Sequence, residues 1–155
     1  MVDLHEIEAI KRLKYRYCRC LDEKRWAELE DCLTEDATSA YGGGRYSFTG
    51  RTAILEFLRD ALGGVHRITT HRVHQPEIEL TGPATATGIW ALDDVLIDTV
   101  ANTTLRGAAF YHDTYTKAGG AWRIRSTGYT RVFEERESRG DVRGLRLTVA
   151  PGTPG

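Results

Sequence analysis

Two side chains, Asp22 and His71, would suit proton transfer if the fold brings them together. Asp22 falls at the carboxyl end of a predicted helix, where the helix dipole disfavours a carboxylate by roughly a few tenths of a kcal/mol. A carboxylate beside an imidazole fixes its tautomer and stabilises the imidazolium formed when the other ring nitrogen takes a proton. In contact, the two groups would form a general base with its orienting group. The alternative is that Asp22 caps a turn and His71 is an ordinary strand residue.

The segment around His71 is predicted to be a long strand with a defect. His71 and Val73 share one face by the two-residue period of a strand, and His74 lies on the other. By the same period Ile78 falls on the face of His74 and not on that of Val73. The apolar positions therefore change face between Val73 and Ile78, and Pro76 lies in this interval. Proline has no N–H for a strand ladder, and a β-bulge there would reset the face. We expect His71 to point into a cavity on the concave side of a curved sheet.

Two further polar residues are candidates for contact with a substrate oxygen. Tyr17 shares the buried face of the first predicted helix, so its hydroxyl needs a partner, either a substrate oxygen or a backbone carbonyl of the core. Asp94 ends the strand face that carries Trp90, and a buried charge must be paired or neutralised. Asp94 is therefore a second acid–base group, a partner for His71, or a surface residue at a strand end.

Aromatic residues are candidates for the wall of the cavity. Trp90 shares its face with the small residues Ala86 and Gly88, which predicts a floor that is roomy at one end. An aromatic stripe is also typical of a plain hydrophobic core. The other aromatic candidates for the lining are Tyr41, Tyr46, Phe57, Tyr111 and Tyr129.

Other kinds of site are not expected. His71 and His74 have opposite strand parity, so one metal ion does not easily bind both, and we expect no metal and no cofactor. The glycines of 42–44 are followed by no Lys-Ser/Thr and no helix, which indicates a turn and not a phosphate loop. Neither a serine nor a cysteine lies in a recognisable nucleophile motif.

Composition indicates one ordinary globular domain. The chain has 155 residues, with 41% hydrophobic and 28% charged residues. Its net charge is −1 and it has no basic block, so no nucleic-acid or membrane partner is expected. No stretch approaches the roughly 20 apolar residues of a membrane span, and residues 1–6 do not begin a signal peptide. Three cysteines without a CxxC pair, Cys18, Cys20 and Cys32, predict free thiols in the reducing cytoplasm.

Three helices are predicted before a sheet. The first spans about 4–21, with Lys11, Arg12, Lys14 and Arg16 on its solvent side, and the second runs from Trp26 to Leu33, where 34–37 end it. A glycine hairpin over 40–48 precedes a third helix, which ends at 63–64. Strands follow near 66–81, 84–98, 102–117 and 121–134. Helices followed by an antiparallel meander predict an α+β domain over 1–135, with a tail, 136–155, that is flexible or packs on a neighbouring subunit.

The ordered set of these segments resembles the SnoaL-like branch of the NTF2-like superfamily over residues 4–134. The resemblance implies a conical (cystatin-like) barrel, in which three N-terminal helices pack on a strongly curved, mainly antiparallel sheet around an open pocket. The segments that carry it are Tyr17-x4-Asp22-x3-Trp26, Leu33-Thr34-Glu35-Asp36-Ala37, the His71 strand, and Tyr111-x-Asp113-x-Tyr115 followed by Trp122-Arg123-Ile124.

The same resemblance implies candidate roles. Family members include ketosteroid isomerases, polyketide cyclases, scytalone and bile-acid dehydratases, a dehydrochlorinase and non-catalytic binding proteins. Asp22 and His71 match the Asp–His dyad of the dehydratases and the dehydrochlorinase, and Tyr17 and Asp94 match positions that bile-acid dehydratases use. Arg131 is the best candidate for the arginine that those enzymes carry near the end of the last strand. The resemblance also implies a homodimer or homotrimer that pairs through the convex sheet face.

These observations lead to two hypotheses of different classes. The first is a cofactor-independent lyase (dehydratase) or isomerase that acts on a small hydrophobic ring compound bearing a carbonyl or hydroxyl group. His71 would remove a proton, Asp22 would orient it, and Tyr17 with Asp94 would bind the oxygen. Dehydration is favoured over isomerisation, because the dyad matches the dehydratase members better. The second hypothesis is a non-catalytic ligand-binding or assembly module, since fold does not decide function.

Overall fold

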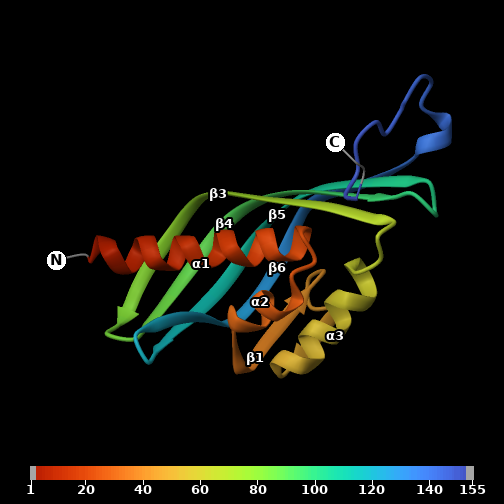
Figure 1. Cartoon of the computed structure of the whole chain (residues 1–155). Coiled ribbons are helices and arrows are strands. Elements are labelled where there is room, and N and C mark those ends of the chain that lie inside the picture. The colour runs from red at the N-terminus through yellow and green to blue at the C-terminus, as the bar shows by residue number, and fades with distance from the viewer. Residues whose placement is uncertain (1–2, 153–155) are drawn as a thin grey trace.

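The computed structural model describes residues 3–152 as three helices against one curved sheet (Figure 1). The helices are α1 (Leu4–Asp22), α2 (Trp26–Asp31) and α3 (Arg51–Leu62). The strands are β1 (Leu33–Tyr41), β2 (Tyr46–Thr49), β3 (Arg67–Gly82), β4 (Thr85–Asp98), β5 (Thr103–Ala118) and β6 (Ala121–Ser138), and a 3-10 turn spans Arg139–Asp141.

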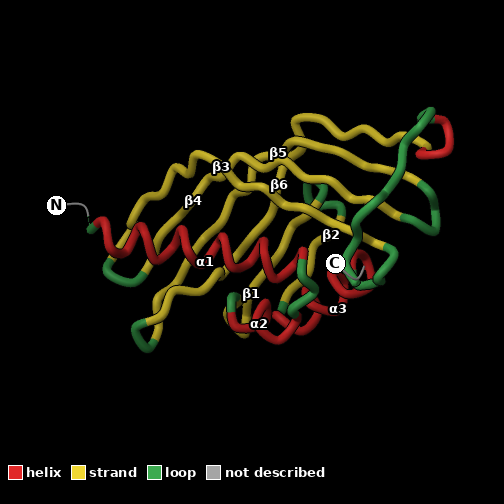
Figure 2. Tube along the Cα trace, turned by 45° about the horizontal axis from the view of Figure 1, so that its top comes forward, coloured by secondary structure: helices red, strands yellow, loops and turns green. Residues whose placement is uncertain are grey.

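The sheet has the strand order β2-β1-β6-β5-β4-β3. Strands β3 to β6 form the predicted antiparallel meander, whereas β1 runs parallel to β6 and antiparallel to β2. The predicted α+β class with three helices on a curved, mainly antiparallel sheet is confirmed. The sheet curves without closing, because β2 and β3 stay at its two edges, and α1 lies across its concave face (Figure 2).

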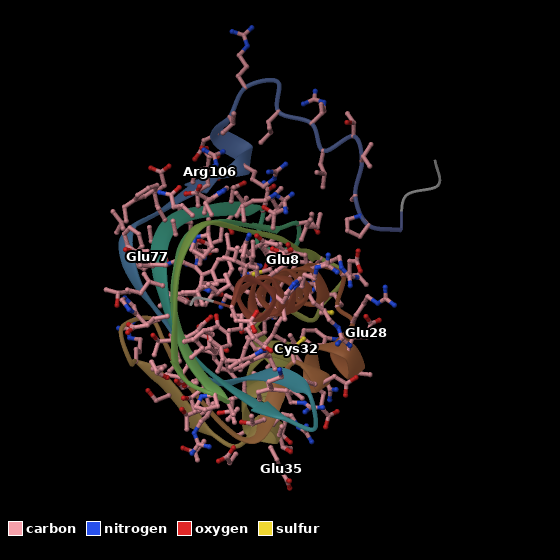
Figure 3. All side chains as sticks on the ribbon, turned by 90° about the vertical axis from the view of Figure 1, so that its left-hand side faces the viewer. Glu8, Glu28, Cys32, Glu35, Glu77 and Arg106 are labelled. Carbon is pink, nitrogen blue, oxygen red and sulfur yellow. The ribbon has the colours of Figure 1, made fainter. Side chains whose placement is uncertain are left out.

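Helix α1 is buried on more sides than its apolar stripe predicts. Its N-cap, Asp3, accepts hydrogen bonds from the backbone N–H groups of His5 and Glu6. Lys14, predicted on the solvent side, is fully buried, and that prediction was wrong. The reason is the curvature of the sheet, because the strands wrap around α1, as the view close to the axis of this helix in Figure 3 shows.

The second helix is shorter than predicted. It ends at Asp31, and the segment expected to close it is the start of strand β1. The segment is a strand because its pairing with β6 places one of its faces on the core. The buried residues of that face are Leu33, Ala37, Ser39 and Tyr41. A tertiary contact with a strand 90 residues away therefore overrides a helical pattern that continued to Leu33.

The predicted defect in the His71 strand is confirmed. The pairing of β3 with β4 shifts register between His74 and Glu77, and Gln75 within the shift has φ +30°. His71, Val73, Ile78 and Leu80 are all partly buried despite their mixed parity, because the bulge resets the face. The hydrophobic phase of the sequence thus located the bulge correctly.

The last strand extends four residues beyond the predicted end at 134, to Ser138. After the 3-10 turn, the chain leads away from the sheet and then returns along its end (Figure 1). This segment carries the exposed side chains of Val142, Leu145, Leu147 and Val149. The final part of the predicted tail, 153–155, lies outside the described residues.

The core holds the three cysteines as buried free thiols. Burial raises the pKa of Cys18 and of Cys32 to about 12, so both thiols are protonated and unreactive at neutral pH. Among residues 3–152, no helix combines the length and hydrophobicity that a membrane crossing requires.

Glu6 ties the start of α1 to the β5–β6 hairpin. Its carboxylate accepts hydrogen bonds from Lys117 Nζ and Trp122 Nε1, both at 2.5 Å. The hydrogen bond from Lys117, followed by that from Trp122, lowers the pKa of Glu6. A carboxyl group whose pKa is lower in the folded state stabilises the fold above its unfolded pKa, and this contribution is lost as the pH falls through the folded pKa.

We therefore expect the free energy of unfolding to fall less steeply between pH 6 and pH 3 in Glu6→Gln than in the wild type. Urea unfolding at several pH values, followed by circular dichroism, measures this difference. Glu56→Gln, at an exposed position of α3, is the control and should keep the wild-type slope. Equal slopes for all three proteins would contradict the role assigned to Glu6.

Candidate active site

A cavity of about 190 Å³ opens between the concave sheet face, the end of α1 and helix α3. Its wall is mainly apolar, with contributions from Leu21, Leu58, Leu92, Leu96 and Leu105. Nine of the eleven candidate site residues line it: Tyr17, Tyr41, Tyr46, Phe57, His71, Asp94, Tyr111, Tyr129 and Arg131. The other two, Asp22 and Trp90, do not line the cavity.

Asp22 lies behind His71 and holds it from two sides. Its Oδ1 is 2.7 Å from His71 Nδ1, and its Oδ2 accepts the backbone N–H of His71 at 2.8 Å. Thr69, which shares the strand face of His71, donates a further hydrogen bond to Oδ1 at 3.0 Å and accepts one from Lys24 at 3.0 Å. Only 12% of the His71 side chain and 16% of the Asp22 side chain are exposed.

The local backbone explains this contact. Helix α1 continues through Asp22, and the chain reverses at Lys24, which has φ +59°. The last turn of α1 therefore lies against β3 at Thr69 and His71. Because Asp22 engages Nδ1, the ring presents Nε2 as its remaining nitrogen, and within residues 3–152 no side chain binds that atom. A histidine in this arrangement can accept a proton from a molecule in the cavity.

The geometry predicts one tautomer for neutral His71, with the proton on Nδ1 and a lone pair on Nε2. Two-bond ¹⁵N–¹H correlation spectra of the ligand-free protein at a pH where the imidazole is neutral should show this tautomer. In Asp22→Asn the amide can donate to Nδ1, so the Nε2–H tautomer should gain population. An unchanged tautomer ratio in Asp22→Asn would contradict the orienting role of the carboxylate.

Two tyrosine hydroxyls meet at the cavity wall. Tyr17 and Tyr41 are both buried, and their hydroxyl oxygens are 3.1 Å apart. Burial raises the pKa of each, so both hydroxyls stay protonated at neutral pH. One donates to the other, and the acceptor of that pair keeps its own O–H for another partner. Phe57 stacks on Tyr41 with the ring centroids 5.8 Å apart and holds it in place.

Asp94 is paired with Arg131. Although β-sheet pairing sets His71 opposite Asp94, the carboxylate accepts two hydrogen bonds from Arg131, at 2.5 and 2.9 Å. Arg131 Nε lies 3.1 Å from Glu134, and its guanidinium lies over the Tyr129 ring at 4.8 Å. Burial disfavours the charge of Arg131, but Asp94 outweighs it and raises the pKa. Asp94 is thus an acceptor held by a guanidinium, and the imidazole contact goes to Asp22.

Trp90 lies outside the cavity. It is fully buried and donates from Nε1 to the Tyr115 hydroxyl at 2.9 Å, with Tyr15 packed edge-on against its ring at 5.9 Å. The positions beside it, Leu92 along the same strand and Tyr111 opposite it on β5, line the cavity instead.

The sequence predicted no role at the site for Thr69, Lys24 or the buried pair Lys14–Asp113. One signal for the pair was present, because Asp113 lies between Tyr111 and Tyr115 on one strand face. A carboxylate at such a position must find a cation or several hydrogen-bond donors in the core.

The fold and the cavity together define a class of protein. Its members have a curved sheet around a tyrosine-rich pocket, and here a histidine on the pocket wall is held from behind by an aspartate. The SnoaL-like domain family matches residues 2–128. The chain therefore belongs to the SnoaL-like family.

Solved structures show the same fold at low sequence identity. A candidate scytalone dehydratase from Novosphingobium aromaticivorans is 22% identical with a TM-score of 0.79, over 98% of this chain and 97% of that one. The hexachlorocyclohexane dehydrochlorinase LinA type 2 is 18% identical with a TM-score of 0.80, over 96% of each chain. A candidate aromatic ring hydroxylase from N. aromaticivorans is 15% identical with a TM-score of 0.78, over 88% and 96%. At these identities the likeness establishes the fold alone.

Proposed function

We propose that this protein is a cofactor-independent lyase, a dehydratase, that eliminates water from a small hydrophobic ring compound bearing a carbonyl and a hydroxyl group. The observation that carries the proposal is the Asp22–His71 contact at 2.7 Å on the wall of an apolar cavity. Structural neighbours that are named as a dehydratase and a dehydrochlorinase, both elimination enzymes, support the reaction class.

The proposed reaction begins at His71. Its Nε2 takes the proton from the carbon beside the substrate carbonyl, and Asp22 stabilises the imidazolium that forms. The electron pair of the broken C–H bond becomes the new double bond as the neighbouring C–O bond breaks. The imidazolium returns its proton to the departing oxygen, so water leaves and no cofactor is needed for balance. Protonated tyrosine hydroxyls on the cavity wall bind the carbonyl oxygen as it gains charge.

We assign Asp94 a different role from the predicted binding of the substrate oxygen. Both of its carboxyl oxygens accept hydrogen bonds from Arg131, so they are engaged there and not by a substrate oxygen. In the proposed function, Asp94 fixes Arg131 against Tyr129 and shapes that side of the cavity.

An isomerase that uses His71 as base, without loss of water, shares the first step. A non-catalytic binding module would use the same cavity without a proton transfer.

A screen separates these functions. Cyclic β-hydroxyketones and hydroxylated dihydro-aromatic compounds would be incubated with the wild type and with His71→Gln, and the loss of water would be followed by mass spectrometry. A product 18 mass units lighter, formed only by the wild type, supports the dehydratase. Deuterium uptake from D₂O without mass loss would indicate an isomerase, and binding without either change would indicate a binding module.

The homodimer or homotrimer and the cytoplasmic location stay predictions. Light scattering would check the oligomeric state, and cell fractionation would check the location.

The charges around the cavity predict a preference for uncharged ligands. Arg131 is the one permanent cation among the residues that line it, and two lining carboxylates, Asp94 and Glu134, already engage its guanidinium. We expect acetophenone to bind at least about 10-fold more tightly than benzoate, a difference of about 1.4 kcal/mol. Quenching of intrinsic fluorescence measures both affinities, and the double variant Asp94→Asn/Glu134→Gln should reduce the ratio. Benzoate binding as tight as that of acetophenone would show that Arg131 leaves its carboxylates to receive an anion.

A further inference from the structure

A pair of opposite charges lies in the core beside the tyrosines that line the cavity. Lys14 of α1 and Asp113 of β5 have no exposed side-chain surface, and Lys14 Nζ lies 2.7 Å from Asp113 Oδ2. Tyr115 also donates to Oδ2, at 2.8 Å, and Thr127 donates to Oδ1 at 2.7 Å. The negative charge of Asp113 is therefore shared among one cation and two hydroxyl groups.

The ammonium group of Lys14 faces two aromatic rings. Nζ lies 3.4 Å from the centroid of the Tyr111 ring and 4.9 Å from that of Tyr17. Within the part of the chain that the structure describes, Asp113 is the one charged partner of this ammonium. A cation over the face of a tyrosine is attracted to the π electrons, and the same attraction draws electron density out of the ring.

Stability does not explain why such a pair is present. Both charges lose their hydration on burial, and an apolar pair of similar volume is often as stable or more stable. The position of the pair points to the cavity, because both rings that the ammonium contacts, Tyr17 and Tyr111, form part of the cavity wall.

Tyr17 and Tyr111 differ in the part of the side chain that makes their contacts. The Tyr17 hydroxyl is hydrogen-bonded to Tyr41, whereas Tyr111 contacts Lys14 and Tyr129 through its ring. Its ring is fixed by an edge-to-face contact with Tyr129, with centroids 5.7 Å apart. Burial raises the pKa of Tyr111, so its O–H is present at neutral pH.

We infer that the Tyr111 hydroxyl donates the hydrogen bond that binds the substrate oxygen, and that Lys14 is a positioning residue that holds the Tyr111 ring and strengthens this donor, while Asp113 holds Lys14 in place. The inference rests on the proposed function and deepens it, because it assigns the group that stabilises the oxygen as His71 withdraws the proton. The ammonium withdraws electron density from the ring, which makes the phenolic O–H a better donor. A donor fixed in advance where charge develops is an effective form of electrostatic catalysis.

The carbonyl stretching frequency of bound acetophenone tests the inference, because a stronger hydrogen bond lowers that frequency. Four proteins would be compared by infrared difference spectroscopy, each at a saturating concentration of acetophenone. They are the wild type, Tyr111→Phe, the charge-free double variant Lys14→Met/Asp113→Asn, and the exposed control pair Glu8→Gln/Lys11→Met on the outer side of α1. Thermal unfolding of each protein records its stability separately.

The wild type and the exposed control should show the same low carbonyl frequency. Tyr111→Phe should shift the band to the frequency of acetophenone in an apolar solvent, and Lys14→Met/Asp113→Asn should shift it part of the way. A band unchanged in Tyr111→Phe would overturn the assignment of the donor. A band unchanged in the double variant, even with a lower melting temperature, would leave the charged pair a structural role only and overturn its positioning role.

The ligand-free protein provides a readout that does not depend on the proposed function. With tyrosine labelled at ¹³Cζ, the double variant should shift the Tyr111 resonance more than that of the exposed Tyr46, and the control pair should shift neither. If acetophenone does not bind to the wild type, the proposed substrate class fails, and this resonance still decides whether Lys14 polarises Tyr111. An unshifted Tyr111 resonance would overturn that effect.

Discussion

Replacement of His71 by glutamine is expected to lower kcat for the proposed elimination by about 10²–10⁴-fold, the usual contribution of a general base. The side chain keeps a similar length and polarity, but it cannot accept a proton at neutral pH. KM should change little, because the wall that binds the ring is formed by other residues, such as Tyr41, Phe57 and Tyr111. Steady-state kinetics on the best substrate from the screen measures both constants.

The same strand offers a matched control. His74 also contacts a carboxylate, with Nε2 3.1 Å from Asp93 of β4, but both side chains are exposed and lie on the other face of the sheet. His74→Gln should therefore keep the wild-type kcat. Asp22→Asn should show a smaller loss than His71→Gln, since the base remains but its tautomer is no longer fixed. Equal activity of His71→Gln and His74→Gln would rule out His71 as the base.

The second large effect is expected on stability and concerns Lys14. Lys14→Met alone should lower the free energy of unfolding by about 3–5 kcal/mol, because it leaves the Asp113 carboxylate buried without its cation. Lys14→Met/Asp113→Asn should recover most of that loss, since the amide oxygen still accepts a hydrogen bond from Tyr115 or Thr127. Urea unfolding of the two single variants and the double variant completes a double-mutant cycle.

The exposed pair Glu8–Lys11 on the same helix is the reference for this cycle. Its atoms lie 3.1 Å apart in solvent, so Lys11→Met should change stability little. If Lys14→Met unfolds at the same urea concentration as Lys11→Met, the buried pair is not coupled in the way that the geometry implies. A double variant as unstable as Lys14→Met would show that packing, and not charge, holds this part of the core.

The cavity and the core are thus connected through one helix. Tyr17 of α1 forms part of the cavity wall and Asp22 binds His71. Lys14, about one turn before Tyr17, pairs with Asp113. A substitution that moves α1 within the curved sheet would therefore change the base, the hydroxyl pair and the Tyr111 ring together. We expect substitutions in α1 to change activity and stability together. Substitutions of residues such as Tyr46, at the exposed side of the cavity, should change activity without changing stability.

The sequence by itself determined those features that depend on local patterns. Apolar spacing predicted α1 and α3, the period of two predicted the four-strand meander, and the phase slip at Pro76 predicted the bulge in β3. These succeed because a helix or a strand repeats its solvent-facing side within a few residues. The candidate residues Asp22 and His71, 49 positions apart, were found through the family resemblance and not through any local rule.

Only the tertiary structure decided how distant residues pair. The end of the predicted second helix is the start of strand β1. Lys14 is buried against Asp113, and Asp94 pairs with Arg131. The fold also sets Trp90 outside the cavity, where its indole binds Tyr115. The physical reason is that strand pairing, burial and charge pairing depend on the curved sheet that distant strands assemble, and no single segment encodes that assembly.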